Sequence, residues 1–232
     1  MDCRSYLGPY LLGPNDENQG IYTGDARELA KAIPDESVDL IFTDPVYQNI
    51  EDYRWLAETA ARVLKPGCDF LVYYAQFHLV ETIDALRVSL DVRWPCVEKR
   101  MLGATGPRIW TYGLQTYALA LLWCSKGKPR TLSSTRTDYT LRLPQSLNHA
   151  WSKNTTGTTS WITRYSEPGD IVWDTFCGGG SIESACKLRN RRWLAFEIDP
   201  GTAERARERV RNTQPPLFVM EPEQAVMDFQ QG

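Results

Sequence analysis

The chain has 232 residues, of which 42% are hydrophobic and 24% are charged, and its net charge is −3. This length suits one domain with a sizeable core, and the composition is that of an ordinary globular protein. No apolar run approaches the ~18 residues that a membrane helix needs, and residues 1–5 lack the charged and apolar regions of a signal peptide. We therefore expect a soluble, cytoplasmic protein and no membrane segment.

The cysteines and histidines bear on metal and disulfide sites. No cysteine pair shows the spacing of a metal finger, and the two histidines, His78 and His149, are far apart in the chain. We therefore expect neither a zinc site nor a disulfide framework, and we expect most cysteines to be reduced side chains of the core. The cysteines are residues 3, 68, 96, 124, 177 and 186.

The charge is unevenly distributed along the chain. Residues 101–148 hold six basic residues against one acid, Asp138, so this segment is +5 and the rest of the chain is −8. Such asymmetry is typical of a face that binds a polyanion. A solvated loop region with chance charge would show the same count, and this alternative stays open.

The first half of the chain predicts strands that alternate with helices. An irregular stretch rich in Gly, Pro and Asn at residues 1–19 comes first, and periodic apolar positions follow. In chain order they predict a strand at 21–23, a helix at 25–32, a strand at 38–43, a helix at 51–64, a strand at 69–74, a helix at 77–88 and a strand at 90–99. The sequence Lys65-Pro66-Gly67 predicts a turn that ends the second helix.

The second half repeats this alternation after an irregular segment. Residues 101–149 predict Gly-rich turns, a basic loop and one apolar strand at 117–124. The elements that follow are a helix at 158–165, a strand at 171–173, a helix at 181–188, a strand at 193–197 and a helix at 202–211. This order predicts an α/β fold with a mainly parallel, twisted sheet and helices on both faces, in one domain over 1–232. The Pro- and Gln-rich tail, 212–232, is expected to be loose.

The stretch DLIFTDPVYQ, residues 39–48, is a buried strand that runs into a carboxylate, a proline and an aromatic ring. Packing of the core alone does not require this order of residues. The tip of a strand is where open α/β sheets place their chemistry. We therefore interpret Asp44, Pro45, Val46 and Tyr47 as candidate catalytic residues.

A second candidate site is the stretch DTFCGGGS, residues 174–181, in which a strand leads through glycines into a helix. Glycines let the backbone approach a ligand closely, and a helix N-terminus offers free N–H groups. Glu197 ends the next strand, where a Rossmann-like fold places an acid on ribose hydroxyls. The spacing fits neither a P-loop nor Gly-x-Gly-x-x-Gly, so it favours a nucleoside-containing cofactor other than NAD.

Together these blocks resemble the permuted (β-class) amino-DNA methyltransferases over roughly residues 20 to 211. The family's catalytic motif precedes its cofactor loop, as it does in this chain. The resemblance implies a Rossmann-like methyltransferase fold that uses S-adenosylmethionine to methylate adenine N6 or cytosine N4. The matching segments are Gly24-Asp25, Ser37 to Tyr47, Arg62 to Cys68, His149 with Lys153, and Asp174 to Ser181.

The resemblance implies roles for the candidate catalytic residues. Asp44 and the carbonyl of Pro45 would each accept a hydrogen bond from the target amino group, which aims the nitrogen lone pair at the methyl group. Tyr47 would stack on the extruded base. Asp rather than Ser at position 44 favours adenine over cytosine as the target of a site-specific DNA methyltransferase. The alternatives are cytosine-N4 methylation, an RNA substrate, or a catalytically silent binding protein.

The cofactor residues follow from the same resemblance. Glu197 would bind the ribose hydroxyls, and Asp25 would face the adenine of the cofactor. The methionine moiety would be held by Asp174, Phe176, Cys177, Gly178, Gly180 and Ser181. Lys153 would line the same pocket. A surface lysine is the alternative, since Asn154 stands where the family has a proline.

The segment between the two halves, about residues 100–148, would recognise the target. It is short, which favours a short or degenerate site, and we expect the DNA to be double-stranded. The residues expected to contact DNA are Lys99, Arg100, Arg108, Lys126, Lys128, Arg130 and Arg136.

One departure from the family pattern and one feature of the tail affect these expectations. Val46 replaces the family's second proline, which frees one φ angle and leaves the catalytic loop less preorganised. In the tail, Gln214 to Phe218 resembles the peptide that docks on bacterial sliding clamps. Packing of Leu217 and Phe218 onto the domain itself is the alternative that we favour. The sequence leaves open a monomer or a dimer.

Overall fold

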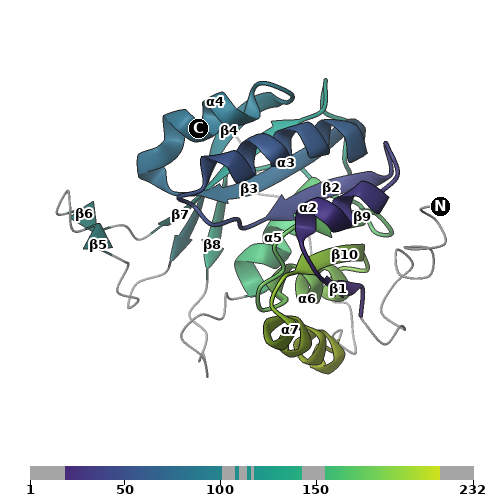
Figure 1. Ribbon diagram of the computed structural model, residues 1–232. Helices are drawn as coiled ribbons and strands as arrows, with labels where there is room; N and C mark the ends of the chain where they lie inside the picture. The colour runs from purple at the N-terminus through teal and green to yellow at the C-terminus, as the bar shows by residue number, and fades with distance from the viewer. Residues whose placement is uncertain (1–18, 101–107, 110–113, 116–117, 143–154, 215–232) are drawn as a thin grey trace, which may run out of the picture.

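The computed structural model describes residues 19–100, 108–109, 114–115, 118–142 and 155–214. An eight-stranded sheet forms the centre of the molecule, and helices cover both of its faces (Figure 1). The strand order is β1-β10-β9-β2-β3-β7-β4-β8. Strands that are far apart in the sequence are therefore neighbours, and β2 lies between β9 and β3.

Most neighbouring strands of the sheet are parallel. The exception is β7, which runs antiparallel to both β3 and β4. The strands are β1 (Ile21–Thr23), β2 (Val38–Thr43), β3 (Leu64–Tyr74), β4 (Asp91–Arg100), β7 (Ala118–Ser125), β8 (Tyr139–Arg142), β9 (Ile171–Asp174) and β10 (Arg192–Glu197); β5 (Arg108–Ile109) and β6 (Leu114–Gln115) form a separate hairpin. The carboxyl ends of the parallel strands meet at one edge, which we call the carboxyl edge, and the opposite edge is the amino edge.

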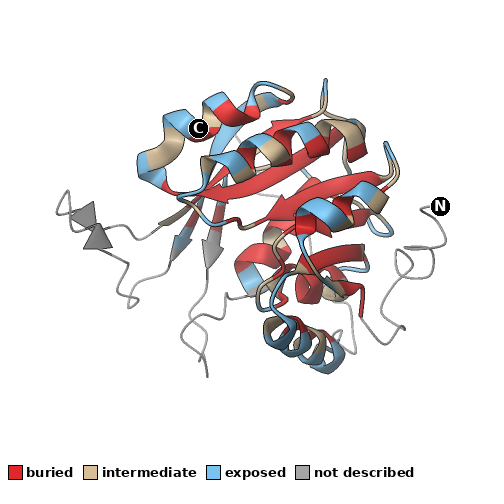
Figure 2. Ribbon diagram, viewed as in Figure 1, coloured by how far each residue is buried: buried red, intermediate tan, exposed pale blue. Residues whose placement is uncertain are grey.

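The helices form two layers. One layer holds α2 (Ala26–Leu29), α3 (Ile50–Val63) and α4 (Leu79–Leu86), and the other holds α5 (Thr155–Tyr165), α6 (Ser181–Leu188) and α7 (Pro200–Asn212). The short 3-10 helices η2 (Ala30–Ala32) and η3 (Gln76–His78) flank α2 and α4. Figure 2 shows the buried sheet between helices whose outer faces are exposed. Among the described residues, no helix has both the length and the apolar character to cross a membrane.

The central strand β2 explains the two-layer core. All six of its residues are buried. Successive side chains of a strand point to opposite faces, so a strand that is covered on both faces reads as a continuous apolar run. Ile41 accordingly joins the core cluster under α3, whereas Leu40 and Phe42 join the cluster under α5 to α7.

The predicted fold class is confirmed, and each predicted helix and strand has a counterpart in the structure. Two local predictions are corrected. The turn at Lys65-Pro66-Gly67 lies within β3, which begins at Leu64 directly after α3; Gly67, at φ 77°, donates its N–H to the carbonyl of Lys126 at 2.7 Å. The basic loop contains β8, a parallel partner of β4 that is too short to give a periodic signal.

Candidate active site

The two candidate motifs meet at the carboxyl edge of the sheet. β2 and β9 are parallel neighbours, so the residues after their last positions lie side by side. The hydroxyl of Thr43 donates a hydrogen bond to Oδ1 of Asp174 at 2.9 Å, which joins residues that are 131 positions apart. On the other side of β9, Gly24 donates its N–H to the carbonyl of Glu197 at 2.9 Å. The fold therefore brings both predicted sites into one place.

The four candidate catalytic residues form the loop that leaves β2. Asp44 is half-buried and Pro45 is buried, whereas Val46 is 66% exposed. The hydroxyl of Tyr47 donates a hydrogen bond to Oδ1 of Asp44 at 2.8 Å. The Tyr47 ring also packs against the core cluster beneath α5 to α7. The carboxylate and the aromatic ring thus have a fixed relative position at the mouth of the site.

The glycine loop lies between β9 and α6. Gly178 and Gly180 have φ values of 51° and 71°, which side chains rarely adopt. A Cβ atom at Gly180 would come within 3.1 Å of Ala206, so this glycine lets α7 approach closely; a Cβ atom at Gly178 would meet nothing within 4 Å. The N–H of Gly178 donates to Oε2 of Glu197 at 2.9 Å. The backbone of Gly178 therefore borders open space beside the Glu197 carboxylate.

One cavity joins the catalytic loop to the glycine loop. Its volume is ≈ 630 Å³. Its lining includes Asp44, Tyr73, Asp174, Phe176, Gly178 and Ser181. Burial raises the pKa of Asp174 to about 7, and the donors Thr43 and Phe176 partly oppose this shift. A ligand in the cavity would thus touch both motifs and a carboxyl group that titrates near neutral pH.

Models of two known protein families match parts of this chain. The family described as DNA methylase matches residues 122–208, and a family described as methyltransferase domain matches residues 12–72. The Type II methyltransferase M.BamHI of Bacillus amyloliquefaciens is 26% identical over 243 residues, which cover 83% of this chain and 57% of that protein. The chain thus matches little more than half the length of this relative.

The chain is similar to DNA methyltransferases in both of these comparisons.

Solved structures of such methyltransferases share the fold. The complex of M1.HpyAVI with SAM superposes with a TM-score of 0.69 at 24% identity and covers 82% of this chain and 98% of that chain. The PvuII DNA methyltransferase, which is named cytosine-N4-specific, gives a TM-score of 0.67 at 19% identity and covers 83% and 90% of the two chains. These likenesses show that the sheet and its helices are arranged as in known amino-DNA methyltransferases.

A buried carboxylate that the sequence analysis missed lies next to the cavity residue Tyr73. Glu98 on β4 is 1% exposed and accepts hydrogen bonds from the Tyr73 hydroxyl at 2.8 Å and from Trp161 Nε1 at 3.2 Å. A Cβ atom at Gly157 would come within 2.5 Å of the Glu98 carboxyl group. The predicted helix began only at residue 158, so the sequence analysis did not place Gly157 in a helix, where glycine costs about 1 kcal/mol relative to alanine; α5 begins at Thr155 and includes it.

The other predicted cofactor residues have mixed surroundings. Asp25 is exposed, and its side chain accepts the N–H of Arg27 at 2.8 Å, which caps α2. Cys177 is buried, and burial raises the pKa of its thiol well above the usual value. Lys153 lies outside the described residues, as do His149 and residues 215–218 of the tail peptide.

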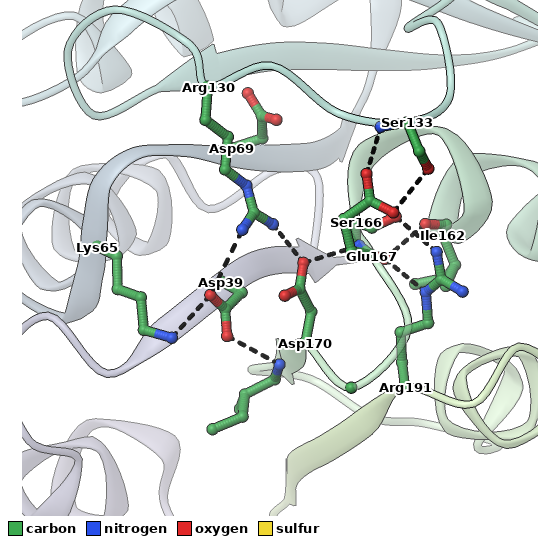
Figure 3. Close-up of polar contacts among 12 residues, drawn as sticks. Asp39, Lys65, Asp69, Arg130, Ser133, Ile162, Ser166, Glu167, Asp170 and Arg191 are labelled. Atoms are coloured by element: carbon green, nitrogen blue, oxygen red, sulfur yellow. Dashed lines mark hydrogen bonds and ion pairs between the residues drawn. The ribbon is translucent and has the colours of Figure 1, made fainter.

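Three of the predicted DNA-contacting cations lie at the amino edge, away from the cavity. Arg130 forms ion pairs with Asp170 and Asp39, and Lys65 reaches Asp39 at 2.7 Å (Figure 3). Arg136 donates Nε to Asp69 at 2.9 Å, and Lys126 pairs with Glu36 at 3.0 Å. These cations therefore have carboxylates of the chain itself as partners.

The remaining predicted cations have other positions. Lys99 and Arg100 end β4, so they lie at the carboxyl edge, and Lys99 is exposed. Lys128 is exposed in the loop after β7, and Arg108 belongs to β5 of the separate hairpin. The structure thus separates Lys99 and Arg100, on the side of the cavity, from Lys126, Arg130 and Arg136 on the opposite side.

Proposed function

We propose that the chain is a site-specific DNA methyltransferase that transfers the methyl group of S-adenosylmethionine to N6 of a flipped-out adenine. The observation that carries this proposal is the single cavity that is lined by both Asp44 and the glycine loop. A donor held on the loop and a base held by Asp44 would meet in that space. The relatives agree with it, since one is named a Type II methyltransferase and another was solved with SAM.

The residues at the carboxyl edge fit such a cofactor. The open space beside Gly178 would admit a ligand against the backbone. We assign the ribose hydroxyls to Glu197, the adenine to Asp25, and the methionine moiety to Asp174, Ser181 and the backbone of Phe176 to Gly180, with Lys153 as a further candidate. When bound, S-adenosylmethionine supplies a methyl group that is already activated by its sulfonium.

The chain's own residues then orient the target amino group. One amino proton would be held by the Asp44 carboxylate and the other by the Pro45 carbonyl, which leaves the nitrogen lone pair pointing into the cavity. Holding the nucleophile in this way replaces a strong base, because the proton can leave after transfer. The hydrogen bond from Tyr47 fixes the carboxylate, and the Tyr47 ring would stack on a base that has left the duplex.

Adenine is the proposed target because position 44 is Asp rather than Ser. Cytosine N4 is the alternative, and it has a specific observation in its favour, since the PvuII enzyme of the same fold is named cytosine-N4-specific. A catalytically silent protein is a second alternative. It is favoured by Val46, whose exposure and lack of a proline ring leave the catalytic loop less constrained.

We assign target recognition to residues of the segment 100–148, and we assign phosphate contacts first to Lys99, Arg100, Arg108 and Lys128. The ion-paired Lys126, Arg130 and Arg136 become secondary candidates, because contact with phosphate would require them to leave their carboxylates. A role beside a restriction enzyme follows from the likeness to a Type II methyltransferase. For the tail we propose packing of Leu217 and Phe218 onto the domain, with docking of Gln214 to Phe218 on a sliding clamp as the alternative. The proposal covers both a monomer and a dimer.

The test is incubation with unmethylated duplex DNA and S-adenosylmethionine, followed by mass spectrometry of the nucleosides. N6-methyladenine is the expected product. N4-methylcytosine would keep the enzyme class and overturn the base assignment. Cofactor binding without any methylated base, in duplex DNA or in RNA, would overturn the proposal in favour of the silent protein.

A further inference from the structure

A pair of buried carboxyl groups lies beneath the glycine loop. Asp174 ends β9, Glu183 lies in the first turn of α6, and the two residues are 2% and 0% exposed. The charge of Asp174 raises the pKa of Glu183, so ionisation of one group opposes ionisation of the other. Neither group forms an ion pair with a described residue, and two neighbouring carboxyl groups in such a buried place are not both ionised. The pair therefore holds at least one proton.

The donors around the pair show which group is the acid. Asp174 accepts hydrogen bonds from the hydroxyl of Thr43 at 2.9 Å and from the N–H of Phe176 at 3.1 Å. No donor among the described residues completes a hydrogen bond to either oxygen of Glu183. Hydrogen bonds to a carboxylate favour its charged form. Asp174 is therefore the anion, and Glu183 carries the proton.

The other groups that face the pair agree with this assignment. The carboxylate of Asp44 faces Asp174 from β2, and its charge raises the pKa of Asp174. The thiols of Cys177 and Cys186 face Glu183, and burial raises the pKa of both, so they are neutral. Arg209 of α7 also faces Glu183, but its NH1 donates to the carbonyl of Gly179 at 3.0 Å. Among the described residues, neither carboxyl group forms an ion pair.

We propose that Glu183 is a positioning residue that stays neutral and donates a hydrogen bond to Asp174, so that Asp174 can bind a cationic methyl donor as an anion. Only Asp174 of the two lines the cavity, and Glu183 lies behind it. The inference rests on the proposed function, because it takes the methyl donor to be S-adenosylmethionine. It adds a residue of α6 that the sequence pattern did not connect with the site.

The charge balance gives a pH dependence. Below the pKa of Asp174, about 7, both carboxyl groups carry a proton. A bound cation favours the ionised Asp174, so one proton leaves to the solvent when the cation binds, and binding tightens as the pH rises through about 7. The affinity for the methyl donor should be about tenfold weaker at about pH 6 than at about pH 8.

Two substitutions of Glu183 test whether its carboxyl group is neutral or charged. In Glu183→Gln the amide still donates a hydrogen bond to Asp174, so the pH profile of S-adenosylmethionine binding should match that of the unmodified protein. In Glu183→Met the hydrogen-bond donor to Asp174 is lost. The midpoint of the pH profile of S-adenosylmethionine binding should then move up by about one pH unit, with about fivefold weaker binding at about pH 7. Isothermal titration calorimetry measures both, and the exposed Glu208→Gln on α7 is the matched control.

The opposite shifts would overturn the inference. If Glu183 is ionised, both substitutions remove a negative charge beside Asp174, and both midpoints move to lower pH. Midpoints that are the same in all variants would overturn it too. Titration of groups of the cofactor itself affects every variant equally. It therefore does not change the difference in midpoint between a variant and the unmodified chain.

Infrared spectroscopy of the cofactor-free protein tests the proton without any need for the Met variant to fold. With ¹³C-labelled glutamate, the unmodified chain should show the band of a protonated glutamic acid at neutral pH, and Glu183→Gln should lack it. Absence of this band in the unmodified chain would overturn the inference. A chain that fails to bind S-adenosylmethionine at any pH would instead overturn the proposed function, so the two failures are distinguishable.

Discussion

Buried and partly buried acids lie at both edges of the sheet, but their partners differ. At the amino edge, Asp39 and Asp170 pair with a lysine or an arginine (Figure 3). Asp69 pairs with Arg136 at the same edge. At the carboxyl edge, Asp174 and Glu197 form no ion pair with any described residue and accept hydrogen bonds from a hydroxyl and from backbone N–H groups instead.

This difference separates structure from function. A buried carboxylate with a cationic partner is already neutralised, so it holds the loop after β7 against the sheet and has little attraction left for a ligand. A carboxylate that has only neutral donors keeps its negative charge for whatever enters the cavity. A substitution should therefore mainly change stability at the amino edge and mainly change ligand binding at the carboxyl edge.

The largest expected effect is on stability, at the amino edge. Asp69 is fully buried and accepts hydrogen bonds from Arg136 and from Trp123 Nε1 at 2.8 Å. Asp69→Ala leaves the largely buried Arg136 cation without its partner and should cost about 3–5 kcal/mol of unfolding free energy. Denaturant titration measures this loss. The exposed Asp84→Ala, which also removes an ion pair, should cost less than about 1 kcal/mol; equal losses would contradict the assigned difference.

A smaller loss is expected beneath the carboxyl edge. In Gly157→Ala the new methyl group would meet the Glu98 carboxyl group at 2.5 Å, so the contact between α5 and β4 must open. Overpacking of this kind should lower the unfolding free energy by about 1–3 kcal/mol. Gly201→Ala on α7 is the matched control, because its new Cβ would meet only ordinary contacts. A stability gain in Gly157→Ala would show that Glu98 is not held against α5.

The two edges should also differ in DNA binding. Lys99→Ala removes an exposed cation from the end of β4 at the carboxyl edge, so DNA affinity should fall severalfold and its salt dependence should decrease by about one charge. Lys126→Ala removes an ion-paired cation of the amino edge and should leave DNA affinity nearly unchanged. Fluorescence anisotropy with duplex DNA at several salt concentrations measures both variants, and the reverse ranking would place the DNA on the other edge.

The smallest expected effect concerns the catalytic loop. Val46→Pro introduces the residue that the family has at this position into an exposed loop of the chain. If the loop accepts the ring, the unfolded chain loses conformational freedom, and the unfolding free energy should rise by about 0.4–1 kcal/mol. Thermal unfolding measures this gain. Lower stability together with lost methyl transfer would show that the loop needs a φ angle that proline forbids.

The sequence predicts this site well where chemistry is tied to a strand end. The residues after β2 and β9 could be placed together because parallel neighbours end at one edge, and the spacing from Gly178 to Glu197 is carried by one helix. Contacts across the layers could not be predicted. Glu183 reads as an ordinary acid in the first turn of a helix, and only the packing of α6 against β9 shows that it faces Asp174.

The basic segment, residues 101–148, shows the same limit of prediction from sequence. Six basic residues in 101–148 predicted a face for a polyanion, but a charge count does not show which cations have partners. Arg130 and Arg136 are paired with Asp170 and Asp69, which come from distant parts of the sequence. Burial of those acids depends on the register of β3 and on the loop before β9, neither of which a charge pattern encodes.

The most direct test of the central claim separates cofactor binding from methyl transfer at Asp44. S-adenosylmethionine affinity and methyl transfer to duplex DNA would be measured for the unmodified chain and for Asp44→Ala. We expect affinity within about threefold, because Asp44 orients the target base, and a loss of transfer of at least about a hundredfold. Methyl transfer that survives in Asp44→Ala would contradict the account, because the cavity would then not bring the glycine loop and the catalytic carboxylate to one reaction.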